Sequence, residues 1–224
     1  MGSEMCIRDR DAELVRNYGD YGRADVIGVK AGTYQFKIVP VDEEGTEMTG
    51  QAVESSTFEV KAHDRAGFAH FNYSGVGAYK DDGTLKDNAK VLYVTSKTAK
   101  TVTCPVVTDN KGKVETFTGL QTIIDARQKG YDTTPLVIRI IGLIEANDMD
   151  HFSSSAEGLQ IKGKNANSEM NITLEGVGND ATIRGFGILL RNCKSIEIRN
   201  FAIMLCMDCL LYTSDAADDL IGVD

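Results

Sequence analysis

The last residues of the chain, CMDCLLYTSDAADDLIGVD (206–224), are of types that could bind a metal ion. Cys206 and Cys209 lie three positions apart, and Asp208 stands between them. Thiolates are ligands for Zn²⁺, whereas carboxylates are ligands for hard cations such as Ca²⁺. The stretch therefore raises the question of whether it is a metal site, an acidic tail or a segment of another origin.

A second group of candidate ligands lies in NDMDHFSSS (147–155), which holds Asp148, Asp150 and His151. Mixed imidazole and carboxylate ligands can bind a metal. The polar character of this segment predicts instead an exposed insertion between two strands.

Two further histidines and one cysteine complete the candidates. His63 and His70 flank aromatic residues in a linker, and the sequence identifies no partner for either. Cys193 has no histidine near it in the sequence to act as a base. We therefore expect Cys193 to pack at a corner of the fold rather than to act as a nucleophile.

Both ends of the chain match translated adapters of transposase-based sequencing libraries. MCIRDR (5–10) matches the in-frame translation of a forward mosaic end, and CLLYTSDAADD (209–219) matches that of the reversed partner adapter. A forward adapter at one end and a reversed one at the other predicts that residues 1–10 and 209–224 are not native. Such scars are excluded from reasoning about the fold.

The remaining chain is mildly acidic and has three scattered cysteines. Without these ends the 24 basic and 33 acidic residues fall to 22 and 27, and the net charge changes from −9 to −5. A phosphate backbone is therefore an unexpected partner, so we expect no nucleic acid. No apolar run approaches the roughly 20 residues that span a bilayer, so we expect no membrane span. Cys104, Cys193 and Cys206 lack the spacing of a zinc site or a disulfide framework.

The composition predicts an all-β chain of one or two domains, because 22 glycines accompany frequent β-branched runs.

Within residues 11–62, Tyr34, Phe36 and Ile38 alternate with polar neighbours, as in a half-buried strand. Further strands are predicted at ADVIGV (24–29) and VESSTFEVKA (53–62). The stretch GTYQFKIVPVDEEG resembles the last strands of fibronectin type III or other immunoglobulin-like modules, which implies a partial β-sandwich over 11–62. Residues 63–90 show little hydrophobic periodicity, which predicts a linker.

Residues 118–129 are predicted as the one helix. Its apolar face is formed by Leu120, Ile123 and Ile124, which lie at helical spacing. Thr118 is placed to cap its start and Gly130 to end it. Strands are predicted at 91–95 and at 135–144, the latter apolar on both faces as buried parallel strands are. Residues 103–119 are predicted to be rich in loops, with a hairpin turn near 110–112.

Short apolar runs separated by turns of Gly, Asn, Asp and Lys fill residues 159–204. The separate runs are Leu159–Ile161, Ile172–Leu174, Ala181–Ile183, Gly187–Leu190, Ile196–Ile198 and Phe201–Met204. The triplet Ile172–Leu174 recurs as Ile196–Ile198, 24 residues later. A period of this length made of short strands is typical of a solenoid. We therefore predict the first coils of a right-handed parallel β-helix, with isoleucine and leucine pointing inward, Thr173 and Glu197 pointing outward, and the 118–129 helix capping the open end.

The order of these elements and the segment ITLEGVGNDATIRGFGILLRNCKSIEIRNFAIM (172–204) resemble the N-terminal half of the pectate lyases of polysaccharide lyase family 1. The resemblance covers residues 91–208. The matching positions are Gly176, Gly178, Ala181, Ile183, Gly185, Gly187, Ile196, Ile198, Arg199 and Asn200. It implies a secreted, extracellular enzyme whose partner is pectate (polygalacturonate) or a related uronan.

The resemblance also implies a chemistry. These enzymes cleave by β-elimination, in which Ca²⁺ binds the uronate carboxylate and an arginine on a later coil is the base. Asp208 stands where the calcium site of the family begins, which makes it the candidate metal ligand. The other ligands and the catalytic arginine would lie beyond it, so we expect residues 91–208 alone to be inactive. Arg184, Arg191 and Arg199 precede the catalytic coil and are expected to face outward or to pack.

Two other classes of function remain open. A hydrolase of the polygalacturonase type would need a pair of aspartates as general acid and base. The sequence of the predicted coils offers no such pair. A non-catalytic adhesin or carbohydrate-binding solenoid is also compatible with the predicted β-helix and sandwich.

Overall fold

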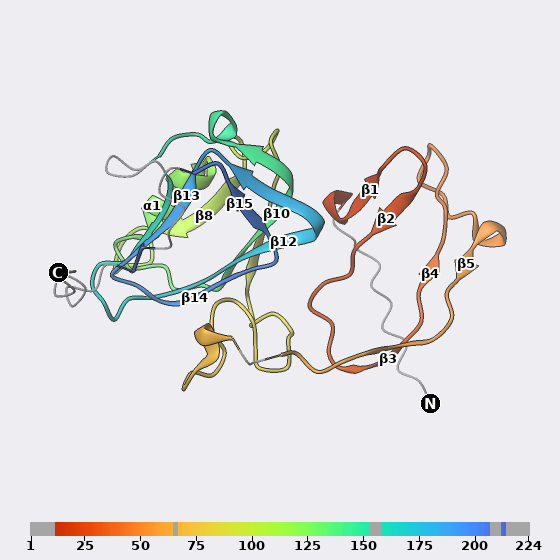
Figure 1. Cartoon of the computed structure of the whole chain (residues 1–224), viewed down its shortest axis with the longest axis horizontal. Coiled ribbons are helices and arrows are strands. Elements are labelled where there is room, and N and C mark those ends of the chain that lie inside the picture. Colours follow the sequence, from red (N-terminus) through yellow and green to blue (C-terminus); the bar gives the residue numbers. More distant parts are fainter. Residues whose placement is uncertain (1–11, 65–66, 153–157, 207–211, 214–224) are drawn as a thin grey trace, which may run out of the picture.

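The computed structural model describes residues 12–64, 67–152, 158–206 and 212–213 (Figure 1). This part of the chain is mostly β structure with one short α-helix, α1 (Leu120–Arg127), as the composition predicts. Its 3₁₀ segments are η1 (Ala12–Leu14), η2 (Thr49–Gln51), η3 (Phe68–His70) and η4 (Ala146–Asp148). Among the described helices, none is long and apolar enough to cross a membrane.

A parallel sheet forms the centre of the molecule. Its strands lie in the order β14-β12-β10-β7, and β15 pairs with the second part of β12. Their bounds are β7 (Lys90–Val94), β10 (Leu136–Glu145), β12 (Glu169–Arg184), β14 (Lys194–Arg199) and β15 (Ala202–Met204). A second parallel sheet has the order β11-β13-β16, formed by β11 (Gly158–Lys162), β13 (Gly187–Arg191) and β16 (Tyr212–Thr213).

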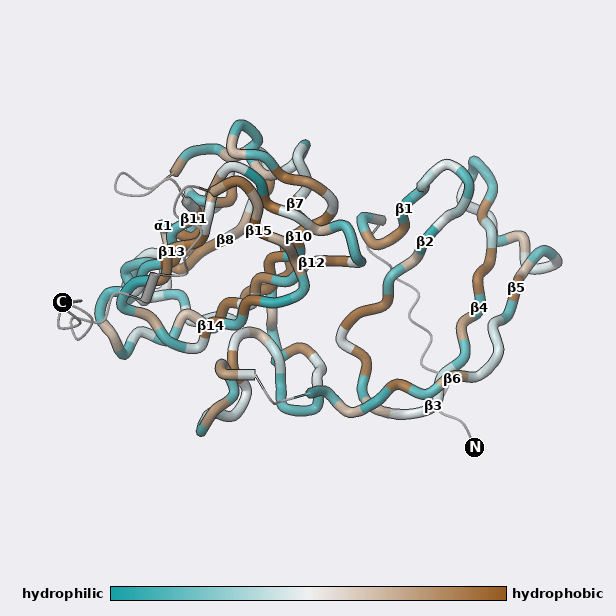
Figure 2. Tube along the Cα trace, viewed as in Figure 1, coloured by the Kyte–Doolittle hydropathy of each residue, from teal (hydrophilic) through white to brown (hydrophobic). Residues whose placement is uncertain are grey.

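The apolar core lies on one face of the central sheet, against the second sheet and α1. The register pairs Leu136 with Ile172 and Ile172 with Ile196, so that branched side chains follow one another from strand to strand. Leu136 and Ile172 are fully buried, and Ile196 packs against the same cluster. The inward positions predicted from the alternation are thereby confirmed, and Figure 2 shows hydrophobic residues along β10 and β12.

Two strand predictions need correction within this region. Residues 172–174 and 181–183, expected as separate runs, belong to the single strand β12. Residues 103–119 are less loop-rich than expected, because β8 (Thr103–Val107) and β9 (Val114–Thr118) pair along their whole length as an antiparallel hairpin. The predicted turn is present, with Gly112 at φ 82°.

Helix α1 has the predicted apolar face but a different start. Leu120, Ile123 and Ile124 are buried in the core. Thr118 does not cap the helix, because it is the last residue of β9 and Gly119 occupies the cap position with φ 94°. A glycine there provides no side-chain acceptor, so the free N–H groups of the first turn need another partner.

The strands of residues 12–64 form small antiparallel pairs. They are β1 (Val15–Asn17) with β2 (Gly22–Ala24), β3 (Gly32–Tyr34) with β6 (Phe58–Val60), and β4 (Lys37–Ile38) with β5 (Val53–Glu54). The expected strand at 24–29 is wrong, since only Ala24 lies in a strand. Leu14 alone is buried among these residues, and Phe36 and Ile38 are exposed. Leu14 and the half-buried Ile27 pack instead against Ile141 of β10 and Val177 of β12, so the buried apolar cluster of this part is shared with the central sheet.

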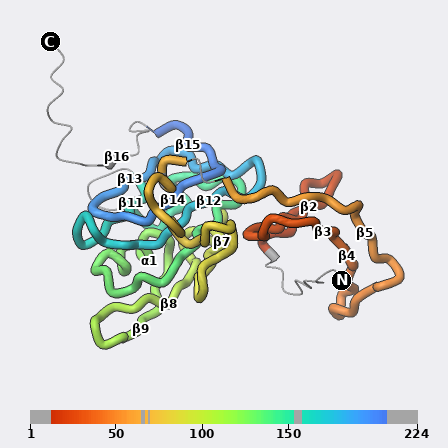
Figure 3. The backbone as a smooth tube through the Cα atoms, turned by 90° about the horizontal axis from the view of Figure 1, so that it is seen from below, coloured from red at the N-terminus to blue at the C-terminus, as the bar shows by residue number. Residues whose placement is uncertain are grey.

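Residues 75–79, which we name the strap, lie in the segment predicted as a linker, yet they pack closely against the sheet (Figure 3). Val76, Ala78 and Tyr79 are buried. The backbone N–H groups of Gly77 and Ala78 donate to Ser195 Oγ and Thr173 Oγ1, at 3.1 and 2.9 Å. The strap therefore covers the face of the central sheet opposite the core, which we name the outer face.

Gly77→Ala should destabilise the protein by roughly 2–5 kcal/mol. A φ of 65° strains a residue with a Cβ by about 1–2 kcal/mol. The added Cβ would also collide with Thr173 Oγ1 and lie 3.2 Å from the Ile172 carbonyl, which adds an overpacking cost of about 1–3 kcal/mol. Denaturant unfolding measures the loss.

Gly112→Ala is the matched control for Gly77→Ala. Gly112 has a φ of 82°, and no atom lies within 4 Å of the position of its added Cβ. Its substitution should cost only the strain of about 1–2 kcal/mol. Equal losses for the two variants would contradict the close packing of the strap on the sheet.

Candidate functional site

The outer face carries polar side chains in two rows that run across the strands. The register aligns Arg139 of β10 with Glu175 of β12 and Arg199 of β14. The neighbouring row contains Thr173 of β12 and Glu197 of β14. The prediction that Thr173 and Glu197 point away from the core is confirmed, but both are buried because the strap and its neighbouring residues cover them.

Glu175 is the centre of the first row. Its carboxylate accepts hydrogen bonds from Arg139 Nε at 2.9 Å, Arg199 Nη2 at 2.8 Å and the Tyr79 hydroxyl at 2.6 Å. Arg199 also lies over the Tyr79 ring at 4.5 Å from its centroid. One buried carboxylate therefore faces two guanidinium groups and a phenol.

The electrostatics of this group keep the Tyr79 phenol and the two guanidinium groups in their usual protonation states. Burial raises the pKa of Tyr79, and the negative charge of Glu175 raises it further, so the phenol remains a donor. Burial acts to lower the pKa of Arg139 and Arg199, but their acidic and phenolic partners outweigh it and raise the pKa of both. The arginines are hydrogen-bonded cations, which makes them unsuited to act as bases here.

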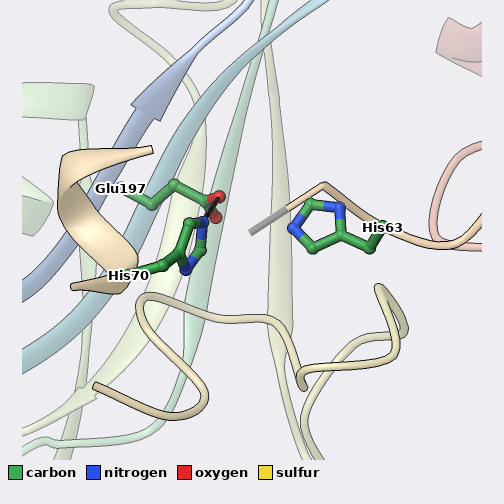
Figure 4. Close-up of side chains that lie close together, drawn as sticks. All are labelled: His63, His70 and Glu197. Carbon is green, nitrogen blue, oxygen red and sulfur yellow. Dashed lines mark ion pairs between the residues drawn. The ribbon is translucent and has the colours of Figure 1, made fainter. Parts of the chain in front are cut away.

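The second row ends in a group of three potential metal ligands, His63, His70 and Glu197 (Figure 4). His70 belongs to η3 and its Nε2 lies 3.2 Å from Glu197 Oε1, with both side chains buried. The His63 ring stands at right angles to that of His70, with centroids 5.8 Å apart. One ligand atom from each residue lies within 4.8 Å of those of the other two.

Other residues hold Glu197 in position. Thr173 Oγ1 donates to its Oε2 at 3.2 Å, and Arg199 Nη1 donates to its Oε1 at 3.1 Å. The same Thr173 hydroxyl accepts the Ala78 N–H of the strap. Glu197 is therefore oriented on both oxygens before any ligand binds, as a coordinating carboxylate usually is.

The candidates of the 147–155 segment, Asp148, Asp150 and His151, have structural contacts. Asp150 accepts the backbone N–H groups of Gln121 and Thr122, both at 3.0 Å, and thus caps α1 from outside the helix. Burial acts to raise the pKa of Asp150, but these hydrogen bonds outweigh it and lower the pKa. His151 lies 3.1 Å from Asp150 and 3.2 Å from Asp125. Asp148 accepts the Glu145 N–H.

The other sequence candidates are distributed as follows. Asp208, the candidate calcium ligand, lies outside the described residues. Arg184 pairs with Glu145 at the surface, and Arg191 is half-buried at the end of β13. Arg199 packs on the outer face. Cys193 packs against the core as expected, and burial raises the pKa of its thiol.

The His63–His70–Glu197 group was missed by reasoning from the sequence. The two histidines are seven positions apart in an irregular segment, and Glu197 follows 127 positions after His70. No ligand-spacing motif covers such a separation. The one signal available was the outward position of Glu197 on a strand.

Comparison with known proteins leaves the chain without an assigned family. No family model matches it, no curated protein matches it, and no solved structure matches it.

Proposed function

We propose that residues 91–208 are the first coils of a right-handed parallel β-helix and part of a polysaccharide lyase that cleaves pectate by β-elimination. The supporting observation is the contact among the residues that carry the family resemblance. Asn200 Nδ2 donates to the carbonyl oxygens of Gly176 and Gly178, at 2.7 and 3.1 Å. Asn200 itself has φ 59°. This side chain joins the residue after β14 to the middle of β12, between the part of β12 that pairs with β14 and the part that pairs with β15, as an asparagine at the corner of stacked coils does.

The order of the strands also supports the proposal. Ile172 pairs with Leu136, 36 positions earlier, and with Ile196, 24 positions later, always in parallel. The second sheet repeats the arrangement, with Leu159 beside Ile188. Parallel strands that follow one another in chain order, with apolar side chains aligned toward one interior, are what a solenoid requires.

On this proposal, residues 11–62 are the end of a fibronectin type III or immunoglobulin-like module of the same extracellular protein. Their antiparallel pairs and exposed Phe36 and Ile38 agree with half of a sandwich that lacks its second sheet. The partner would be polygalacturonate or a related uronan.

The calcium ion that the resemblance implies has no matching site among the described residues. Calcium takes six to eight oxygen ligands. The one group of three or more possible ligands in the described ranges contains two imidazoles and a single carboxylate, which does not suit it. No catalytic step is therefore assigned to the described side chains.

The experiment compares this chain with a longer product of the same gene. The coding sequence of the longer product is obtained by sequencing the source DNA past the codon of residue 208. With polygalacturonate and Ca²⁺, the longer product should release unsaturated uronides, detected by ultraviolet absorbance, and a calcium chelator should abolish the release. The 224-residue chain should release none. Activity of this chain by itself would overturn the assignment of the catalytic residues to the later coils.

The same assay separates the other classes of function. New reducing ends without ultraviolet absorbance would identify a hydrolase. Retention on immobilised polygalacturonate without cleavage would identify a binding solenoid. Either result with a folded longer product would overturn the lyase proposal.

A further inference from the structure

The group formed by His63, His70 and Glu197 lies where a segment from the N-terminal part of the chain reaches the central sheet. His63 stands before the strap, His70 ends η3, and Glu197 is on β14. Figure 4 shows the ring of His63 directed toward His70 and the Glu197 carboxylate. The group is on the outer face and depends on no feature of the lyase proposal.

The distances suit a small metal ion with few ligands. Zinc–nitrogen and zinc–oxygen bonds of about 2.0–2.2 Å in a tetrahedron place the ligand atoms roughly 3.3 Å apart. His70 Nε2 and Glu197 Oε1 are already 3.2 Å apart. The third ligand atom, on His63, is within 4.8 Å of both and needs a shift of about 1.5 Å to complete the site.

The surroundings of Glu197 and His70 favour coordination. Glu197 is oriented by Thr173 and Arg199 on its two oxygens. The His70 side chain is buried, and its Nε2 faces the Glu197 carboxylate. The imidazole of histidine is the commonest metal ligand in proteins.

The ligand types select the metal. Two imidazole nitrogens and one carboxylate oxygen are the protein ligands of many zinc sites that keep a fourth position for water. Calcium and magnesium prefer oxygen ligands. Zn²⁺ is therefore the ion that fits, and Co²⁺, which takes the same geometry, is a spectroscopic substitute.

We propose that His63, His70 and Glu197 bind one Zn²⁺ ion, which fastens residues 63–70 to β14. The site joins the segment that follows the N-terminal strands to the outer face of the central sheet. Zinc binding would thus hold the two parts of the chain together, because an ion that binds only the folded arrangement stabilises it.

Zn²⁺ titration of the complete chain tests the proposal. The metal-free, reduced protein competes with a chromophoric chelator, so that stoichiometry and affinity are both measured. We expect one equivalent to bind, and the affinity to fall by at least about 100-fold in His63→Ala and in His70→Ala. His151→Ala is the matched control, because His151 is the third histidine of the chain and is paired with Asp150 and Asp125; its affinity should not change.

Co²⁺ absorption provides a second measurement that requires no variant to fold. Ligation by nitrogen and oxygen should give weak visible bands, whereas thiolate ligation would give intense near-ultraviolet charge transfer. The proposal is overturned by absence of stoichiometric binding, by wild-type affinity in the His63→Ala/His70→Ala double variant, by an equal loss in His151→Ala, or by thiolate bands that place the metal at a cysteine.

Discussion

Glu175→Gln should lower the free energy of unfolding by about 3–5 kcal/mol, because it removes the one negative charge between two buried or half-buried arginines. Glutamine has nearly the same shape, so the effect reports charge rather than packing. Arg139 would keep its positive charge at a site where its side chain is 5 % exposed and lose its carboxylate at 2.9 Å. Arg199 would lose its contact with the same carboxylate at 2.8 Å. Denaturant unfolding followed by circular dichroism measures the change.

Glu145→Gln is the control for Glu175→Gln. Glu145 pairs with Arg184 across the neighbouring strands β10 and β12, as Glu175 pairs with Arg139, but both side chains are more than 40 % exposed. An exposed pair contributes about 0–1 kcal/mol. A loss in Glu175→Gln no larger than in the control would show that the strap does not bury the outer face.

Asp132→Asn should also cost about 3–5 kcal/mol at neutral pH, through a different buried pair. Arg127 of α1 has no exposed side-chain surface, and its Nη1 lies 3.3 Å from Asp132 Oδ1. Burial lowers the pKa of Arg127, which Asp132 opposes, but an arginine remains charged at neutral pH. The amide would leave that charge without its counter-ion. Its single oxygen could accept either the Val107 N–H, now 3.1 Å from Oδ2, or the Thr134 N–H, now 2.9 Å from Oδ1, but not both.

The pH dependence of unfolding gives a second readout for Asp132. Burial acts to raise the pKa of Asp132, but Arg127 and the hydrogen bonds from Thr134 and Val107 outweigh it and lower the pKa. A carboxyl whose pKa is lower in the folded state contributes stability above its unfolded pKa of about 3.9, and that contribution is lost as the pH falls through the folded pKa. The stability of wild type and of Asp132→Asn should therefore converge in acid. A difference that stays constant from neutral to acidic pH would contradict the charge-based explanation.

Local patterns in the sequence were sufficient to predict the core and most elements of residues 91–204. Alternation placed Ile172 and Leu174 in the core, and helical spacing placed Ile123 and Ile124 there. These predictions succeed because burial of an apolar side chain depends on the period of its own element. The same reasoning failed at 24–29, where an apolar run has no neighbouring strand to pair with.

Contacts between distant polar residues were decided by the tertiary structure alone. Alternation shows that Glu197 points outward, yet it does not show that His70 lies opposite, 3.2 Å away. Likewise, Arg139, Glu175 and Arg199 meet because the connections between their strands have lengths that align them in register. Register depends on the geometry of each connection and on the packing of the whole sheet, and neither is encoded in a local period. The sequence by itself therefore determined the interior, whereas the buried charge network and the candidate zinc site exist only because the folded chain brings the strap, His63 and His70 onto the outer face.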